Sequence, residues 1–309
     1  MRVAFFGTPE FGIPILESLM KSSHELVCVV TQPDRPVGRG GKVIHSAVKD
    51  WAIKNNIPVI QPERISKEIE LLEPFSPDVI ITAAFGQMLR QNVLDYPKYG
   101  VINVHTSLLP KYRGSSPVHW AIMKGETTTG ITTMQTDIGM DTGDIIMSKS
   151  IQIDENENCE ELTKRLSFIG AELIVTTLDS IENGTAKRTP QNHDEASHYP
   201  MLKKEDGRID WTRSAKDINN QIRGLNPWPI AYFEYNGEQF RVYKANIVDD
   251  KELRGRAGKV LVSDTKNGLA IQCGAGILEP LIVQSSGGKR LGIKDFLNGR
   301  RFELGSILD

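Results

Sequence analysis

The sequence predicts an α/β fold followed by a smaller all-β domain. Over residues 2–184, short apolar segments alternate with stretches of helical periodicity. This alternation is typical of a doubly wound, mostly parallel sheet, whose strands read as apolar runs because both faces are buried. From residue 208 onward, short strand-like segments are instead separated by Asn-Gly, Gly and Asp turns. A chain of 309 residues is long enough for two domains, each with its own core.

The elements of the first domain follow in order from the apolar pattern. Strands are expected at residues 2–8, 25–32, 57–61, 78–84 and 101–105. Helices are expected at residues 14–22, 46–56, 67–75 and 159–183. Gly184 is a favourable stop for the last helix, because glycine readily adopts the left-handed conformation that ends helices. We therefore assign residues 1–184 to the first domain.

The second domain is expected to be a small open barrel. Residues 185–207 are polar, contain two prolines and lack periodicity, so they predict a linker. Within residues 208–309, a short helix at 214–225 precedes five short strands between residues 231 and 284. Short strands joined by tight turns favour a β-barrel of the OB type, an architecture that often binds nucleic acids.

The composition narrows the class of protein. Three cysteines lie far apart without a CxxC pair, so neither disulfides nor a zinc site is expected. The sequence has no apolar run near 18 residues and no charged and then apolar leader, which predicts a soluble, cytoplasmic protein without a membrane partner. From residue 204 onward, 17 Lys and Arg face 14 Asp and Glu, although the whole chain has a net charge of −2. This asymmetry permits a polyanionic partner for the second domain.

The segment 101–121 carries the side chains best suited to chemistry. Asn103 and His105 lie two residues apart on a predicted strand, so they point to the same face. An imidazole can move a proton near neutral pH, and an amide N–H can stabilise a developing oxyanion. Asp141 lies in a later turn between two strand-like segments, where it could orient His105 and stabilise its imidazolium form. Together the three residues predict acyl-transfer chemistry.

Each of these residues also has a structural explanation. A buried histidine or a strand asparagine can serve packing or capping, and Asp before Thr-Gly is favourable turn chemistry. His119, beside Trp120, is expected to be a packing residue, whereas His24 and His45 show no partner in the sequence. Their combination with the sequence motif described next favours the catalytic interpretation.

The same residues carry a family resemblance. The pattern N-V-H-x-S-L-L-P-x-Y-R-G at residues 103–114, with D-x-G-x-D-T-G-D at residues 137–144, resembles the formyltransferases that use 10-formyltetrahydrofolate. Over the whole chain, the resemblance is to members of that family that act on methionyl-tRNA. It implies a Rossmann-like catalytic domain, catalytic roles for Asn103, His105 and Asp141, and 10-formyltetrahydrofolate as the formyl donor. It requires no metal.

The resemblance also implies a folate site. Residues 82–89 follow the carboxyl end of a predicted strand, where ligands bind in open parallel sheets. Small residues followed by apolar ones could form a slot for a flat pterin ring, or could simply begin a core helix. The expected folate-binding residues are Phe85, Gly86, Gln87, Met88, Leu89, Ser107, Leu108, Leu109, Pro110 and Asp137.

Residues 32–45 form the longest interruption in the alternation. They are rich in proline and glycine and carry Arg35, Arg39 and Lys42. Long loops without secondary structure are usually functional or disordered, and a plain solvated loop is the alternative here. A flexible basic segment can become ordered on a phosphate backbone. The resemblance implies that Arg39, assisted by Lys42, contacts the acceptor stem of a tRNA.

Basic side chains of the second domain could form a phosphate-binding face. The candidates are Arg254, Arg256, Lys259, Lys289, Arg290, Arg300 and Arg301. Scattered solvated charge is the alternative for each of them taken alone. As a set, and together with the basic segment 32–45, they favour tRNA as the partner.

The resemblance therefore implies an enzyme that transfers the formyl group of 10-formyltetrahydrofolate to the α-amine of methionyl-initiator tRNA, and a monomer is expected. One alternative keeps the chemistry but changes the acceptor to an amino-sugar nucleotide or another small amine. A second alternative is a catalytically idle RNA-binding protein on an enzyme scaffold.

Overall fold

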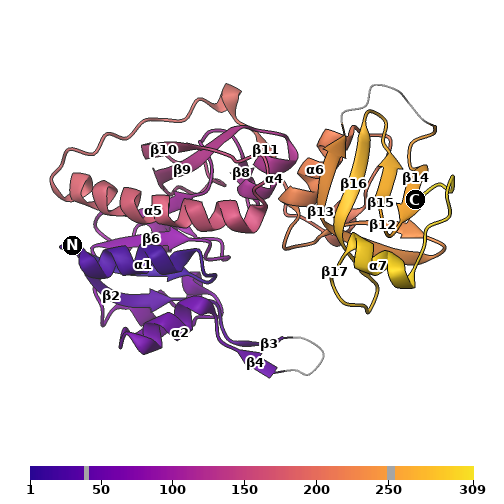
Figure 1. Cartoon of the computed structure of the whole chain (residues 1–309). Coiled ribbons are helices and arrows are strands. Elements are labelled where there is room, and N and C mark those ends of the chain that lie inside the picture. Colours follow the sequence, from indigo (N-terminus) through magenta and orange to yellow (C-terminus); the bar gives the residue numbers. More distant parts are fainter. Residues whose placement is uncertain (38–41, 249–254) are drawn as a thin grey trace. The chain divides into compact units, whose positions relative to one another are not determined.

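The structure is a computed structural model that describes residues 1–37, 42–248 and 255–309. It divides into two compact units (Figure 1). The N-terminal unit comprises Met1–Pro117, Thr128–Ile151 and Thr163–Tyr199, and the C-terminal unit comprises Val118–Thr127, Gln152–Leu162 and Pro200–Asp309. Within the described ranges, no helix combines the length and apolar character needed to span a membrane.

A seven-stranded sheet forms the centre of the N-terminal unit, in the order β10-β9-β7-β6-β1-β2-β5. Strands β1, β2, β5, β6 and β7 are mutually parallel, whereas β9 runs antiparallel to β7. The predicted doubly wound, mostly parallel sheet is therefore confirmed. The strand bounds are β1 (Arg2–Gly7), β2 (Glu25–Val30), β5 (Val59–Ile60), β6 (Val79–Ala83), β7 (Val101–His105), β9 (Thr128–Gln135) and β10 (Ile145–Gln152).

The strand order creates a switch point beside β1. From β1 the chain runs outward through β2 to β5, and then returns to the opposite side of β1 as β6. Open α/β sheets bind ligands in the crevice at the carboxyl ends of strands near such a point. β6 and β7 end here, at Ala83 and His105. The fold thus brings the predicted catalytic strand to the expected edge.

Helices cover this sheet and pack closely where small residues allow it. The helix bounds before residue 200 are α1 (Gly12–Lys21), α2 (Ala47–Lys54), α3 (Gln91–Leu94), α4 (Pro117–Met123) and α5 (Cys159–Glu182), of which α4 belongs from Val118 onward to the C-terminal unit. Ser18 of α1 donates to the Ala171 carbonyl of α5 at 2.9 Å, which joins the two helices. A Cβ at Gly170 would lie 3.0 Å from Val104, so glycine lets α5 approach β7.

The helix predicted at residues 67–75 is wrong. The chain instead forms two 3₁₀ turns, η1 (Ile65–Lys67) and η2 (Ile69–Leu72), separated by Glu68 in a non-helical conformation. The Glu68 carboxylate accepts a hydrogen bond from the Arg64 backbone N–H at 2.9 Å, which stabilises the break. A segment this short, with Pro74 next to its last residue, also gains too few helical hydrogen bonds to offset the cost of nucleation.

Residues 32–45 contain a short hairpin rather than the loop without secondary structure predicted above. β3 (Arg35–Val37) pairs with β4 (Lys42–Ile44) in antiparallel register, and Figure 1 shows the pair extending outward from the N-terminal unit. At its base, Asp34 accepts hydrogen bonds from Lys49 and from Gln61. Arg39 lies outside the described residues, as does Arg254 of the second domain.

The C-terminal unit is built on an antiparallel sheet in the order β12-β13-β16-β15-β14, with β17 beside β16. Its core includes the stacked rings of Phe233 and Phe240, whose centroids are 5.5 Å apart. Glu234 of β12 exchanges backbone hydrogen bonds with Asp309, and Val260 of β14 donates to Ser306. The last residues of the chain thus bridge the two edge strands, and the predicted β domain is confirmed.

The remaining elements extend from the predicted linker to the end of the chain. Their bounds are η3 (His193–Glu195), β11 (His198–Tyr199), η4 (Lys204–Gly207), α6 (Ala215–Gly224), β12 (Ala231–Tyr235), β13 (Glu238–Val248), β14 (Val260–Asp264), β15 (Gly268–Gln272), β16 (Ile277–Ser285), β17 (Leu291–Gly292) and α7 (Ile293–Gly299). The expected linker therefore carries short elements of its own.

Candidate active site

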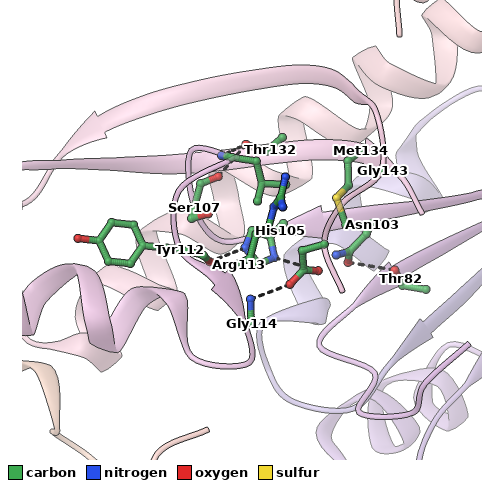
Figure 2. Close-up of polar contacts among 12 residues, drawn as sticks. Thr82, Asn103, His105, Ser107, Tyr112, Arg113, Gly114, Thr132, Met134 and Gly143 are labelled. Carbon is green, nitrogen blue, oxygen red and sulfur yellow. Dashed lines mark hydrogen bonds and ion pairs between the residues drawn. The ribbon is translucent and has the colours of Figure 1, made fainter. Parts of the chain in front are cut away.

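Asn103 and His105 lie at the carboxyl edge of the central sheet (Figure 2). Asn103 is paired in register with Thr82 of the neighbouring strand β6. The Thr82 hydroxyl donates a hydrogen bond to Asn103 Oδ1 at 3.0 Å. Because the amide oxygen is engaged as an acceptor, the orientation of the amide is fixed and its N–H groups are available to donate elsewhere.

The His105 ring is held by a backbone carbonyl. Its side chain is 6% exposed, and Nε2 lies 3.0 Å from the Tyr112 carbonyl oxygen. A carbonyl can only accept, so the neutral ring carries its proton on Nε2 and keeps a lone pair on Nδ1. The sequence suggested that Asp141 orients this ring, but the contact with Tyr112 does so.

Asp141 faces the other nitrogen of the ring. Its Oδ1 lies 3.7 Å from His105 Nδ1, which is longer than a hydrogen bond but close enough for charge to matter. Its Oδ2 accepts a hydrogen bond of 2.8 Å from the Gly114 N–H, which fixes the carboxylate (Figure 2). This arrangement places a fixed carboxylate opposite the ring nitrogen that carries the lone pair.

The turn that presents Asp141 is organised by Asp137. Asp137 Oδ1 accepts hydrogen bonds from the Gly139 N–H at 3.1 Å and from the Thr142 hydroxyl at 2.7 Å. On the same turn, Ile138 and Met140 are 64% and 55% exposed. Asp137, expected to bind folate, thus has a clear structural role in the turn.

The expected folate segment 85–89 has mixed surroundings. Phe85 and Leu89 are buried in the core of the unit, and the Phe85 ring lies 5.0 Å from that of Phe6. The Gln87 amide is engaged at both ends by the backbone: its Oε1 accepts from the Ile65 N–H and its Nε2 donates to the Pro62 carbonyl. Gly86 adopts a left-handed φ of 83°, and Met88 is 65% exposed. Of the side chains in this segment, Met88 is therefore the most accessible to a ligand.

Residues 107–110 are pinned against β9. The Thr132 hydroxyl donates to the Ser107 carbonyl at 2.7 Å and accepts from the Leu109 N–H at 3.2 Å. The Ser107 hydroxyl in turn donates to the Lys111 carbonyl at 2.7 Å. Ser107 and Leu109 are buried, whereas Leu108 and Pro110 are half-buried. These hydrogen bonds fix the loop, and Leu108 and Pro110 are its partly exposed residues.

Sequence reasoning missed a buried cluster around Arg113. The Arg113 guanidinium, only 2% exposed as a residue, donates to Gln191 Oε1 through Nε at 3.0 Å and through Nη2 at 2.6 Å. It also lies 3.3 Å from His193 Nδ1. The only signal in the sequence was the position of Arg113 inside the motif, next to Tyr112. Nothing local indicates Gln191, which is 78 residues away.

The candidate tRNA-binding residues that the structure describes belong to the β3–β4 hairpin and to the C-terminal unit. Arg35 is exposed and pairs with Glu63 at 3.2 Å, and Lys42, the first residue of β4, pairs through its backbone with Val37 of β3. In the C-terminal unit, Arg290 stacks over the Tyr243 ring at 3.6 Å. Arg300 forms an ion pair with Glu238. Arg256, Lys289 and Arg301 are exposed, whereas Lys259 is half-buried.

The remaining histidines are structural in character. His24 is buried, with Nε2 3.2 Å from Asp179, and His45 Nδ1 lies 2.8 Å from Asp50. The statement that these two histidines have no partner is therefore wrong. Burial lowers the pKa of His119 to about 4, which agrees with the packing role expected for it.

The fold and the site together define a formyl transferase. The family described as "Formyl transferase" matches residues 1–178, and "Formyl transferase, C-terminal domain" matches residues 201–301. The methionyl-tRNA formyltransferase of Acetivibrio thermocellus is 44% identical over 100% of this chain and 99% of its own length. That of Agathobacter rectalis is 45% identical over 99% of each chain. The chain belongs to the methionyl-tRNA formyltransferase family.

Solved structures share the fold at lower identity. The N-formyltransferase from Helicobacter canadensis, solved with folinic acid and dTDP-3-aminofucose, gives a TM-score of 0.68 at 20% identity and covers 90% of this chain and 98% of its own. A methionyl-tRNA formyltransferase from Clostridium thermocellum gives a TM-score of 0.56 at 17% identity, covering 81% of this chain and 95% of its own. At these identities, the likeness establishes the fold alone.

Proposed function

We propose that the protein transfers the formyl group of 10-formyltetrahydrofolate to the α-amine of methionyl-initiator tRNA. The observation that carries the acceptor is the 44% identity with a methionyl-tRNA formyltransferase along the entire chain. The chemistry is supported by the amide, imidazole and carboxylate at the carboxyl edge of the sheet. The product is N-formylmethionyl-tRNA, the aminoacyl-tRNA that starts translation.

The proposed reaction begins when the neutral amine attacks the formyl carbon. A C–N bond forms to the amine, and the formyl oxygen gains negative charge as the carbon becomes tetrahedral. Asn103, whose amide oxygen is held by Thr82, donates an N–H to this oxygen. Stabilisation of this kind typically contributes about 10²–10³-fold to kcat. No covalent bond to the enzyme is needed.

His105 is the proposed proton carrier. With Nε2–H held by Tyr112, Nδ1 is the basic atom that accepts the proton released by the attacking amine. The resulting imidazolium is stabilised by the Asp141 carboxylate, 3.7 Å away. It then returns the proton to N10 of the folate as the bond from N10 to the formyl carbon breaks. The proposal invokes no metal.

The folate is proposed to bind beside Asn103 among side chains from three loops. Met88, Ile138 and Met140 are large, apolar and more than half exposed, as suits contact with a flat ring system. Leu108 and Pro110 offer further apolar surface. In this proposal Phe85, Gly86, Gln87, Leu89, Ser107, Leu109 and Asp137 contribute mainly by shaping the loops or through their backbone.

The tRNA is proposed to contact the basic hairpin and the C-terminal unit. Arg35, Arg39 and Lys42 would approach phosphates of the acceptor stem, and the basic residues of the C-terminal unit would add electrostatic attraction. A cytoplasmic monomer is part of the proposal. So is the division into a catalytic domain at residues 1–184, a linker at 185–207 and a tRNA-binding domain at 208–309.

A second acceptor class is the amino-sugar nucleotide that the sequence left as an alternative. The N-formyltransferase from Helicobacter canadensis was solved with an amino-sugar nucleotide, and its fold covers 90% of this chain. An acceptor panel decides between the two classes. We expect formyl transfer to methionyl-initiator tRNA and not to uncharged tRNA, free methionine or dTDP-3-aminofucose. Transfer to the amino-sugar nucleotide alone would replace the proposed acceptor.

A further inference from the structure

Arg113 and Gln191 are buried next to the candidate catalytic residues, but they are not themselves candidates for catalysis. Both side chains belong to the N-terminal unit, and both are more than nine-tenths buried. A buried guanidinium is costly unless its donors are satisfied, and here the guanidinium donates to a neutral amide and lies 3.3 Å from an imidazole nitrogen. The free-energy cost of burying this charge suggests that the pair has a role beyond packing.

Gln191 connects Arg113 to the turn that carries Asp141. Its Oε1 accepts two hydrogen bonds from the guanidinium, so its Nε2 must point the other way. Nε2 donates to the Asp141 carbonyl at 2.9 Å and to the Gly143 carbonyl at 2.7 Å. All the hydrogen-bonding groups of the amide are thereby used in one orientation. The backbone on both sides of Thr142 is fixed as a result.

The backbone next to Arg113 holds both His105 and Asp141. Arg113 follows Tyr112, whose carbonyl accepts the hydrogen bond from His105 Nε2. It precedes Gly114, whose N–H donates to the Asp141 carboxylate. The Arg113 backbone N–H itself donates to the Ser197 carbonyl at 2.8 Å. In the chain, Arg113 thus lies between Tyr112, whose carbonyl holds the histidine, and Gly114, whose N–H holds the aspartate.

The segment that carries Gln191 is bound along its length to the 112–114 loop. β11 (His198–Tyr199) pairs with β8 (Arg113–Gly114), and the Tyr112 N–H donates to the Ser197 hydroxyl at 2.8 Å. The rings of Tyr112 and Tyr199 stack with centroids 5.0 Å apart. Residues 191–199, inside the predicted linker, therefore behave as a strap across the site.

We propose that Gln191 and Arg113 form a positioning clasp that sets the distance and orientation between His105 and Asp141. This inference rests on the proposed function, because it assigns the pair a role in formyl transfer. Neither residue touches the reacting atoms. Small misplacements of catalytic groups cost up to about 10²-fold in rate, so a clasp of this kind has a measurable effect.

Gln191→Glu tests the clasp with almost no change in shape. The carboxylate keeps the partner Arg113, but it presents an oxygen to the carbonyls of Asp141 and Gly143, which cannot donate to it. We expect kcat to fall at least tenfold, while KM for 10-formyltetrahydrofolate changes less than threefold. A second readout is the NMR signal of the His105 Nε2–H proton, which would be assigned by its loss in His105→Asn. In Gln191→Glu this signal should shift or exchange rapidly with water.

The chain provides a matched control in Gln221. It is 5% exposed, against 6% for Gln191, and its Nε2 likewise donates to two carbonyls, those of Asp206 and Arg208. Its Oε1 accepts from Arg213 at 3.5 Å. Gln221→Glu should lower the thermal midpoint to a similar extent, yet leave kcat within twofold and the His105 signal unchanged. Equal losses of kcat in the two glutamate variants would overturn the clasp.

A second variant covers the case in which Gln191→Glu fails to fold. Arg113→Lys keeps the charge but has too few donors in fixed geometry to hold Gln191 and His193 together. It should give the same loss of kcat and the same change in the His105 signal. Wild-type kcat and an unchanged signal in Arg113→Lys would refute the proposal. If the wild type itself fails to formylate methionyl-tRNA, the proposed function fails instead, and the His105 signal still tests the clasp.

Discussion

Thr82 determines which end of the Asn103 amide can meet a substrate. Its hydroxyl occupies Asn103 Oδ1, and without that bond the amide can rotate and present oxygen toward a developing oxyanion. Two oxygens facing each other would repel. Substituting Thr82 therefore tests the orientation of the Asn103 amide, whereas substituting Asn103 tests the amide itself.

Thr82→Val should lower kcat for formyl transfer about tenfold, equivalent to about 1.4 kcal/mol in the activation barrier. Asn103→Ala should cost more, about 10²–10³-fold, because it removes the donor itself. Both values come from steady-state rates at saturating substrates.

Thr177→Val is the matched control for Thr82→Val. Thr177 is fully buried, and its hydroxyl bonds to Thr133 in the same unit. Its loss should reduce stability by about 1 kcal/mol and leave kcat unchanged. An equal drop in kcat for both valine variants would show that Thr82 acts through stability alone.

His119 gives the protein a pH-dependent stability that is independent of catalysis. Its pKa is lowered to about 4 by burial, against 6.5 in the unfolded chain. The unfolded state therefore binds the proton first, so stability is full above pH 6.5 and declines as the pH falls toward 4. His119→Gln should remove about 2 kcal/mol of the stability difference between pH 7 and pH 4.5, measured by urea unfolding. A wild-type pH dependence in this variant would contradict the assignment.

At the residue scale, the sequence predicts what is local. Asn103 and His105 were found because strand periodicity of two places them on one face. Tyr112 as the partner of His105 could not be found in that way, because a backbone carbonyl carries no residue-specific signal. The partner of Arg113 lies 78 positions away, and that of His24 lies at Asp179. Such contacts follow from tertiary folding.

At the element scale, the basic hairpin β3–β4 is the most distinctive addition to the sheet. Its base is fixed by Asp34, which bonds to Lys49 and Gln61. The acidic Asp34 has a lowered pKa, caused first by the hydrogen bond from Lys49 and then by that from Gln61. The sequence identified the segment by its glycines, prolines and charges but not its pairing, which depends on only three residues in each strand.

Arg39→Ala should raise KM for methionyl-tRNA while leaving KM for 10-formyltetrahydrofolate nearly unchanged. The reason is that a phosphate contact contributes to tRNA affinity and releases counterions, so the salt dependence of tRNA binding should also become shallower by about one unit of slope. Lys54→Ala, on the exposed end of α2, provides a charge-matched control. A loss in folate affinity equal to that in tRNA affinity would place Arg39 in the folate site or the fold instead.

The strap formed by residues 191–199 shows where element prediction fails. Its polar, aperiodic sequence predicts a linker, because two-residue pairing such as β8–β11 leaves no pattern in the sequence. The long helix α5 was predicted nearly to the residue, since a periodic apolar face over many turns is a strong signal.

At the scale of the whole molecule, the α/β unit could be predicted because alternating strands and helices allow few topologies. The antiparallel character of the second unit could also be predicted from its turns. Its closure through the last residues could not, because the backbone bonds between Glu234 and Asp309 join segments with no shared pattern. The acceptor is likewise inferred from the whole chain, because the identity with relatives extends over both units.

The most direct test of the account is the single-turnover rate of formyl transfer to methionyl-initiator tRNA by His105→Ala, compared with the wild type at saturating 10-formyltetrahydrofolate. If Nδ1 of His105 carries the proton from the amine to N10, the rate should fall about 10²–10⁴-fold with little change in the affinity for either substrate. A rate within twofold of the wild type would contradict the proposed role of His105 and, with it, the mechanism.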